Sequence, residues 1–219
     1  MSVPDWLGPL AAALPDVTVD QLTRWAPPDE GGRHSAVLVL FGHGVGGPDV
    51  LLIERAHTMR SHAGQPAFPG GAQDPGDDGP VGAALREAGE EVGLDPLSVE
   101  ILGTLPGLWL PPSGFVVHPV IAFWRRPHEV RAVDAAEVAA VVRAPIAALV
   151  DPANRLRVTH PSGWVGPAFH VGNLLVWGFT AGLLDRLLFL GGWELAWDTG
   201  RVEALDEQTV ALALRTTPP

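Results

Sequence analysis

Apolar runs separated by segments rich in glycine and proline mark the predicted strands. Residues 36–41 and 50–53 form two such runs, and they predict a hairpin whose turn lies at 42–49. Further strands are predicted at 99–104, 115–124, 155–159, 168–171 and 174–179. Helices are predicted at 5–14, 80–93 and 180–190. Strands interspersed with a few helices indicate an α/β protein, folded as a mixed sandwich around one core.

Local signals define the ends of the predicted helices. Pro80 lies in the first turn of the second helix, and Gly93 follows its last turn. Thr180 is the expected N-cap of the third helix. Residues 134–150 stay ambiguous, because their alanine content favours a helix whereas Pro145 breaks one.

The chain divides into three predicted parts. Residues 1–34 form an N-terminal extension, 35–190 form the main domain, and 191–219 form a C-terminal tail. We expect the tail to pack on the domain or on a partner subunit, which would make the protein a homodimer. Residues 58–78 form a long loop rich in glycine and proline, and such a loop inside a compact domain is usually functional.

Composition excludes several kinds of chemistry. The 219 residues include 25 acidic residues and 14 basic ones, all of them arginine, with no lysine, cysteine or tyrosine. The absence of cysteine excludes disulfides, a thiolate nucleophile and cysteine-ligated metals. The absence of lysine excludes Schiff-base catalysis and the lysine-containing phosphate loop of common NTPases. A net charge of −11 argues against nucleic acid as a partner.

No segment predicts insertion into a membrane. Residues 171–190 are apolar and about long enough to span a bilayer, but they contain Asp185, Arg186 and three glycines. We therefore interpret them as a buried strand followed by a helix. Residues 1–9 carry acid and proline in place of the basic start of a signal peptide. The expected location is the cytoplasm.

Acidic residues concentrate around the second predicted helix. Residues 74–91 contain six acidic residues and one arginine, a local net charge of −5. Glu87, Glu90 and Glu91 stand at i, i+3 and i+4 and therefore share one helix face, where they repel one another. A solvated acidic face is the simpler interpretation of such a pattern. The local concentration of carboxylates favours a cation site, and oxygen-only ligands indicate Mg²⁺ or Mn²⁺.

This segment resembles the Nudix box, whose pattern is Gly-x5-Glu-x7-Arg-Glu-U-x-Glu-Glu-x-Gly-U with U aliphatic. Residues 86–94 fit the second half at every defined position if Ala88 is accepted as U. The first half departs from the pattern. Counted from Gly71, the acidic position is Asp77, and eight residues instead of seven separate it from Arg86.

The departure from the first half of the box pattern occurs together with a second signature upstream in the sequence. Leu51, Leu52 and Arg55 are followed by Met59-Arg60, Gly64 and residues 68–71, Phe-Pro-Gly-Gly. This series resembles the coenzyme A pyrophosphatase branch of Nudix hydrolases, which is also similar in its aspartate and its longer spacer. The resemblance spans about residues 35–190. It implies the Nudix fold, an α/β/α sandwich with a mixed β-sheet.

The resemblance also implies roles for individual residues. Glu87, Glu90 and Glu91 are the expected ligands of Mg²⁺ or Mn²⁺, and Gly71 is expected to contribute its backbone carbonyl. Arg86 is expected in the catalytic machinery, where it orients a glutamate. One of these glutamates, or a carboxylate from a later loop, acts as the general base. The sequence leaves this choice open.

Substrate contacts are expected from the upstream signature. Arg55 and Arg60 are the candidates for the substrate's phosphates, since arginine binds phosphate through two parallel hydrogen bonds. Phe68 and Gly70 are expected to shape the loop, although Phe68 fits an ordinary core position equally well. The implied reaction is hydrolysis of the pyrophosphate bond of coenzyme A or a derivative to 3′,5′-ADP and 4′-phosphopantetheine or its acyl form. The alternatives are another nucleotide substrate (ADP-ribose, NADH or a dinucleoside polyphosphate) and a non-catalytic Nudix binding module.

Overall fold

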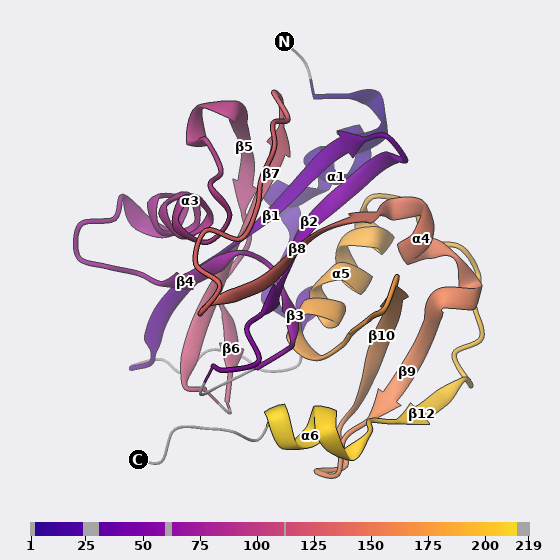
Figure 1. Ribbon diagram of the computed structural model, residues 1–219. Coiled ribbons are helices and arrows are strands. Elements are labelled where there is room, and N and C mark those ends of the chain that lie inside the picture. Colours follow the sequence, from indigo (N-terminus) through magenta and orange to yellow (C-terminus); the bar gives the residue numbers. More distant parts are fainter. Residues whose placement is uncertain (1–2, 24–30, 60–62, 112, 214–219) are drawn as a thin grey trace.

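The computed structural model describes residues 3–23, 31–59, 63–111 and 113–213, which fold into strands and helices (Figure 1). The strands are β1 (Arg33–Gly44), β2 (Gly47–Arg55), β3 (Pro66–Ala67), β4 (Gly70–Ala72), β5 (Val99–Thr104), β6 (Leu108–Leu110), β7 (Phe115–Trp124), β8 (Val138–Pro145), β9 (Arg155–Thr159), β10 (Val165–Val171), β11 (Leu174–Val176) and β12 (Val202–Ala204). The α-helices are α1 (Gly8–Ala13), α2 (Val19–Leu22), α3 (Gly79–Val92), α4 (Ile146–Val150), α5 (Gly178–Leu190) and α6 (Glu207–Ala213). Short 3₁₀ turns are η1 (Asp5–Leu7), η2 (Leu14–Asp16), η3 (Pro96–Ser98) and η4 (Pro152–Asn154).

A mixed sheet forms the centre of the molecule. Its strands lie in the order β3-β2-β1-β7-β5, and β4, β6 and β8 pair with β1, β7 and β2 respectively. The neighbours β1 and β7 are parallel, whereas the other pairs of this sheet are antiparallel. The segments 36–41 and 50–53 are buried on both faces, which explains why their apolar runs are continuous.

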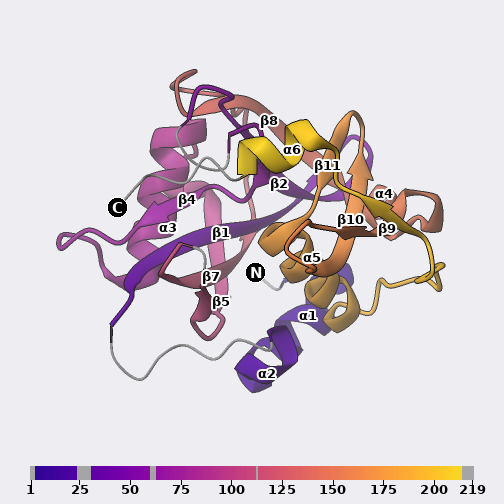
Figure 2. The ribbon, with the colours of Figure 1, turned by 90° about the horizontal axis from the view of Figure 1, so that it is seen from below.

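Helices cover both faces of this sheet, as Figure 2 shows for α3 on one side of β1 and for α1 and α5 on the other. Alternate residues of β1 and β7, such as Leu38 and Val120, pack with the alanines of α3. The intervening positions, such as Val39 and Ile121, pack with α1 and α5. The predicted α/β/α sandwich is therefore confirmed, with its apolar interior divided by the sheet.

A second sheet packs on α5. Its strands lie in the order β11-β10-β9-β12, where β12 is parallel to β9 and belongs to the segment after residue 190. Arg155 on β9 is 1% exposed and pairs with Asp185 of α5 and with Glu194. Its guanidinium also lies 4.4 Å from the ring centre of Trp197. The buried arginine thus links Glu194 and Trp197, which follow α5, to the second sheet.

The structure corrects several predictions and resolves one ambiguous segment. The strand predicted at 174–179 ends at Val176. The turn between β1 and β2 is shorter than 42–49, because the strands pair as far as Gly44 and Gly47. The ambiguous segment 134–150 contains strand β8 followed by α4, since pairing with β2 overrides the helix propensity of its alanines. Thr180 is not an N-cap: α5 begins at Gly178, and the Thr180 hydroxyl donates to the Pro66 carbonyl at 3.1 Å. Residues 1–2 and 24–30 of the predicted N-terminal extension lie outside the described residues.

Among the helices of the described residues, none combines the length and the apolar character that crossing a membrane requires.

Candidate active site

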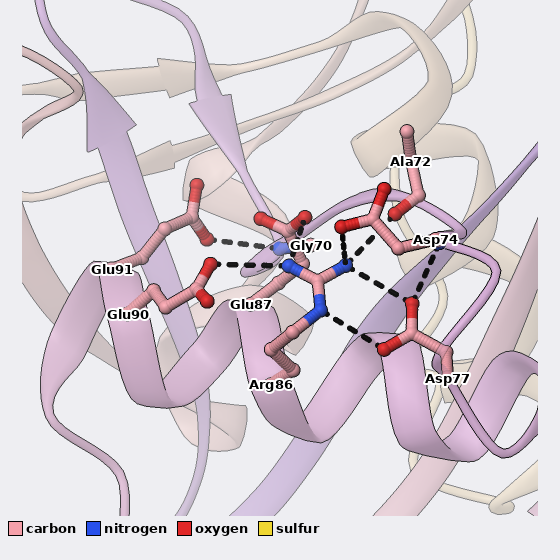
Figure 3. A network of polar contacts seen from close by, with 8 residues as sticks. All are labelled: Gly70, Ala72, Asp74, Asp77, Arg86, Glu87, Glu90 and Glu91. Carbon is pink, nitrogen blue, oxygen red and sulfur yellow. Dashed lines mark hydrogen bonds and ion pairs between the residues drawn. The ribbon is translucent and has the colours of Figure 1, made fainter.

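The acidic helix α3 presents its three glutamates beside strand β4. Ala83, Ala84 and Ala88 are buried against the sheet, so the residues on their other side point toward the loop. The helix ends at Gly93, whose φ of 70° is the left-handed conformation expected of a glycine after the last turn. Glu87, Glu90 and Glu91 consequently lie on the side of α3 that faces residues 70–77 (Figure 3).

The two glycines of β4 hold two of these glutamates closely. The Gly70 N–H donates to Glu91 Oε2 at 2.9 Å. Gly70 has a φ of 156°, and a Cβ there would lie 2.3 Å from the Ala36 carbonyl oxygen of β1. A Cβ on Gly71 would lie 2.4 Å from the carboxyl carbon of Glu87. The backbone of β4 therefore fits between β1 and Glu87 only because both residues are glycine.

Arg86 lies at the centre of the carboxylates (Figure 3). Its Nε and Nη2 donate to the two oxygens of Asp77 at 2.9 and 3.1 Å. Its Nη1 donates to Glu87 at 2.9 Å and to Glu90 at 3.1 Å, and Nη2 also donates to the Ala72 carbonyl at 3.0 Å. The arginine therefore contacts two of the glutamates, and it ties the preceding loop to the helix.

Asp77 closes this network from the loop side. Its carboxylate accepts from Arg86 and from the backbone N–H of Asp74, and these bonds hold its pKa below the usual range. Both of its oxygens are hydrogen-bonded to Arg86. The sequence marks Asp77 only as the acidic position before the longer spacer, and the observed contacts make it the anchor of Arg86.

Burial perturbs two of the glutamates. Desolvation raises the pKa of Glu91 to about 7, against the opposing effects of the Gly70 N–H and Arg55. Desolvation also raises the pKa of Glu87, although Arg86 opposes it. Both carboxylates are additionally repelled by Glu137. A divalent cation bound beside these two desolvated carboxylates would stabilise their charged forms.

The oxygen donors fit a hard cation. Among the described residues, no three His, Cys, Asp or Glu side chains converge into a ready-made metal cage, and Arg86 binds Glu87 and Glu90 in the observed conformation. The side chains on this face nevertheless offer carboxylate oxygens without nitrogen or sulfur donors, the set that Mg²⁺ and Mn²⁺ prefer. The Gly71 carbonyl belongs to the same backbone segment.

The residues predicted to bind substrate have different surroundings. Arg55, at the end of β2, acts electrostatically on Glu91, and within the described part of the chain its buried Nε has no hydrogen-bond partner. Phe68 is 2% exposed in the core, in keeping with the alternative interpretation of that residue. The Gly70 N–H is used by Glu91. Arg60 lies outside the described residues.

Sequence reasoning missed Glu137, the acidic residue before β8. It stands 46 positions after Glu91 in a segment without a recognisable motif. The pairing of β2 with β8 and the backbone hydrogen bonds of residues 131 and 133 to α3 bring it near the helix, so no local signal could have identified it.

Comparison with known proteins decides the family. A family model described as the NUDIX domain matches residues 32–161. The chain belongs to the Nudix family. The chain is 34% identical over 197 residues to the uncharacterized Nudix hydrolase NudL of Citrobacter koseri, which covers 85% of this chain and 93% of that protein. A protein of the same name from Cronobacter sakazakii is 40% identical over 150 residues, 64% of this chain and 73% of that protein.

Solved structures show the same Nudix fold. A Nudix hydrolase of M. smegmatis, RenU, matches with a TM-score of 0.54 and 21% identity over 77% of this chain and 91% of that one. A MutT/nudix family protein of Enterococcus faecalis matches with a TM-score of 0.50 and 16% identity over 86% and 74%. The protein is accordingly a Nudix pyrophosphohydrolase, and α3 carries its Nudix box. Enzymes of this family act on nucleotide derivatives and generally use a divalent metal such as Mg²⁺.

Proposed function

We propose that this Nudix hydrolase cleaves the pyrophosphate bond of coenzyme A or one of its derivatives, giving 3′,5′-ADP and 4′-phosphopantetheine or its acyl form. Mg²⁺ or Mn²⁺ is the proposed cofactor, held by Glu87, Glu90, Glu91 and the Gly71 carbonyl. When bound, the cation offsets the negative charge of the diphosphate and of the departing phosphate. The proposal includes a cytoplasmic location and a homodimer. Size-exclusion chromatography with light scattering would test the homodimer.

Arg55 carries the proposal. It completes the first part of the upstream signature that resembles the coenzyme A pyrophosphatase branch, and its guanidinium acts on Glu91 of the box. Its buried Nε has no hydrogen-bond partner among the described residues. A buried, unpaired arginine donor next to metal-binding carboxylates suits a phosphate oxygen of the substrate. Coenzyme A offers a 3′-phosphate in addition to its diphosphate.

The protein's own groups fix the geometry of the reaction. Arg86 holds Glu87 and Glu90, and the Gly70 N–H holds Glu91, so the three carboxylates are oriented before substrate arrives. Such preorganisation avoids the reorganisation that solvent would require as charge develops. Asp77 keeps Arg86 in place from the loop.

A substrate panel tests the proposal directly. The purified protein is incubated with coenzyme A, acetyl-coenzyme A, dephospho-coenzyme A, ADP-ribose, NADH and a dinucleoside polyphosphate, each with Mg²⁺ and with Mn²⁺. We expect 3′,5′-ADP from coenzyme A, identified by mass spectrometry, at the highest kcat/KM of the panel. If coenzyme A gives no 3′,5′-ADP while another compound of the panel is cleaved, the substrate assignment is refuted.

Variants test the substrate contact and the metal site separately. Arg55→Gln is expected to raise KM for coenzyme A about tenfold or more, since a charge-assisted hydrogen bond contributes about 1.5–3 kcal/mol. Arg131→Gln, an exposed arginine, is the matched control and should leave KM unchanged. Glu90→Gln and Glu91→Gln test the metal site: unchanged turnover of every diphosphate in both variants would refute it.

A further inference from the structure

A small cavity lies between the second sheet, α5 and the segment that follows α5. It has a volume of about 210 Å³ and is lined by Arg157 of β9, Pro167 of β10, Asp185 of α5, Trp197 and Thr199. Figure 1 shows the segment after α5 running beside β9 before it enters β12. None of the lining residues belongs to the Nudix box or to the upstream signature, so the proposed pyrophosphohydrolase function gives this cavity no role.

The geometry of β9 places Arg157 on the side of the second sheet that faces α5. Arg155 and Arg157 stand two positions apart on β9, so their side chains leave the same face of the strand. Arg155 marks that face, because it pairs with Asp185 of α5. The intervening positions pack in a separate apolar cluster on the opposite face. Arg157 is also the register partner of Pro167, which lines the cavity from β10.

The two charged side chains that line the cavity differ in their partners. Asp185 accepts from Arg155 through one carboxylate oxygen and from Arg186, at 2.7 Å, through the other. Arg157 is partly buried, and among the residues that the structure describes no hydrogen bond or ion pair engages its guanidinium. A partly buried guanidinium without a partner has lost water without replacing it, and an anion would satisfy its donors.

Trp197 gives the cavity an aromatic surface that is fixed in place. Its indole N–H donates to Glu194 at 3.4 Å, and the guanidinium of Arg155 lies 4.4 Å from the centre of its ring. Pro167 adds a second apolar ring to the lining, and Thr199 adds a hydroxyl group. A side chain that is held before binding loses little conformational freedom when a planar ligand packs on it.

We propose that this cavity binds a small planar anion, an aromatic ring that carries one phosphate or carboxylate group. The ring packs on Trp197 beside Pro167, and the anionic group accepts two parallel hydrogen bonds from Arg157. The volume equals that of roughly seven water molecules, which suits a single ring with one such group. One unpaired arginine likewise matches one anionic group. The proposal does not depend on the substrate of the Nudix box.

Isothermal titration calorimetry with four probes tests the proposed class of ligand. Benzoate and phenyl phosphate carry a ring and an anionic group, benzamide carries the ring without the charge, and inorganic phosphate carries the charge without the ring. EDTA in the buffer keeps divalent cations from bridging an anion to the box glutamates. We expect benzoate or phenyl phosphate to bind saturably at one site per chain, and benzamide and inorganic phosphate to bind at least about tenfold more weakly. The tighter of the two ring anions identifies the anionic group.

Variants locate the binding. Arg157→Gln should weaken the tighter ring anion at least about tenfold, and Arg157→Lys, which keeps the charge but not the planar fork, should lie between that variant and wild type. Arg131→Gln, at an exposed arginine outside the cavity, is the matched control and should leave the affinity unchanged. Arg55→Gln should also leave it unchanged, because Arg55 belongs to the candidate active site. Melting temperatures without probe check that each variant is folded.

Several results would overturn the proposal. The first is the absence of saturable binding of either ring anion to the wild-type protein up to about 10 mM. The second is an unchanged affinity in both Arg157 variants. The third is a loss of affinity in Arg55→Gln alone, which would assign the binding to the candidate active site. Equal affinities for benzamide and benzoate would refute the anionic class. No measurement here involves hydrolysis, so the failure of this proposal and that of the proposed function are distinguishable.

Discussion

Two adjacent glycines should respond differently to the same substitution. In Gly70→Ala, the new Cβ would lie 2.3 Å from the Ala36 carbonyl oxygen and 2.7 Å from Val37 Cα, both backbone atoms of β1. Neither atom can move without disturbing the pairing of β4 with β1. The φ of 156° adds strain for any residue with a side chain. Backbone strain and overpacking each cost about 1–3 kcal/mol, so the free energy of unfolding should fall by about 2–6 kcal/mol.

In Gly71→Ala, the clash involves a movable group. The new Cβ would lie 2.4 Å from the Glu87 carboxyl carbon, the far end of a flexible side chain. That carboxylate must shift by about 1 Å to reach ordinary van der Waals contact. We expect the free energy of unfolding to change by less than about 1 kcal/mol. The displaced carboxylate should nevertheless lower kcat about 100-fold, because catalytic groups tolerate little misplacement.

Thermal melts followed by circular dichroism and Mg²⁺-dependent turnover distinguish the two effects. For a chain of this size about 1 kcal/mol corresponds to about 2–4 °C, so Gly70→Ala should melt roughly 4–24 °C below wild type. Gly71→Ala should melt within about 4 °C of wild type and should be nearly inactive at a temperature where it is fully folded. Equal destabilisation by both substitutions, or wild-type kcat in Gly71→Ala, would refute the distinction between the two β4 glycines.

Three further predictions concern the scaffold. Burial lowers the pKa of His118, so the unfolded chain accepts a proton at a higher pH than the folded protein does. The free energy of unfolding should therefore fall as the pH drops from about 6.5 through the lowered pKa of the folded state. Urea titrations at several pH values should show a smaller fall in His118→Gln. Asp185→Asn should lower the free energy of unfolding by about 3–5 kcal/mol, because it removes a partner of the buried Arg155. The double variant with Arg155→Met should recover most of that loss. Equal losses in the single and the double variant would contradict the ion-pair argument. Thr180→Val should lower it by about 1–2 kcal/mol through loss of the bond to the Pro66 carbonyl, while Thr180→Ser, which keeps the hydroxyl, should not.

The local sequence determined the position of elements whose pattern of apolar residues is regular along their length. Strands β5, β7 and β9 occupy the predicted residues, because their apolar character is continuous or alternates with a regular period. Pro80 and Gly93 define the ends of α3 through backbone constraints that act within a few residues. The face shared by Glu87, Glu90 and Glu91 follows from helix periodicity alone.

The tertiary structure decided the segments whose partners lie far away in the chain. Strand β8 forms from an alanine-rich segment because it pairs with β2. The Thr180 hydroxyl binds the carbonyl of Pro66 and does not cap α5, which begins at Gly178. The same holds for the site. The sequence marked the box glutamates and Arg55, but the pairing of Asp77 with Arg86 and the approach of Glu137 depend on where two loops return to the sheet. Helix periodicity acts over a few residues and is visible in the sequence, whereas charge–charge contacts between loops depend on the assembled sheet.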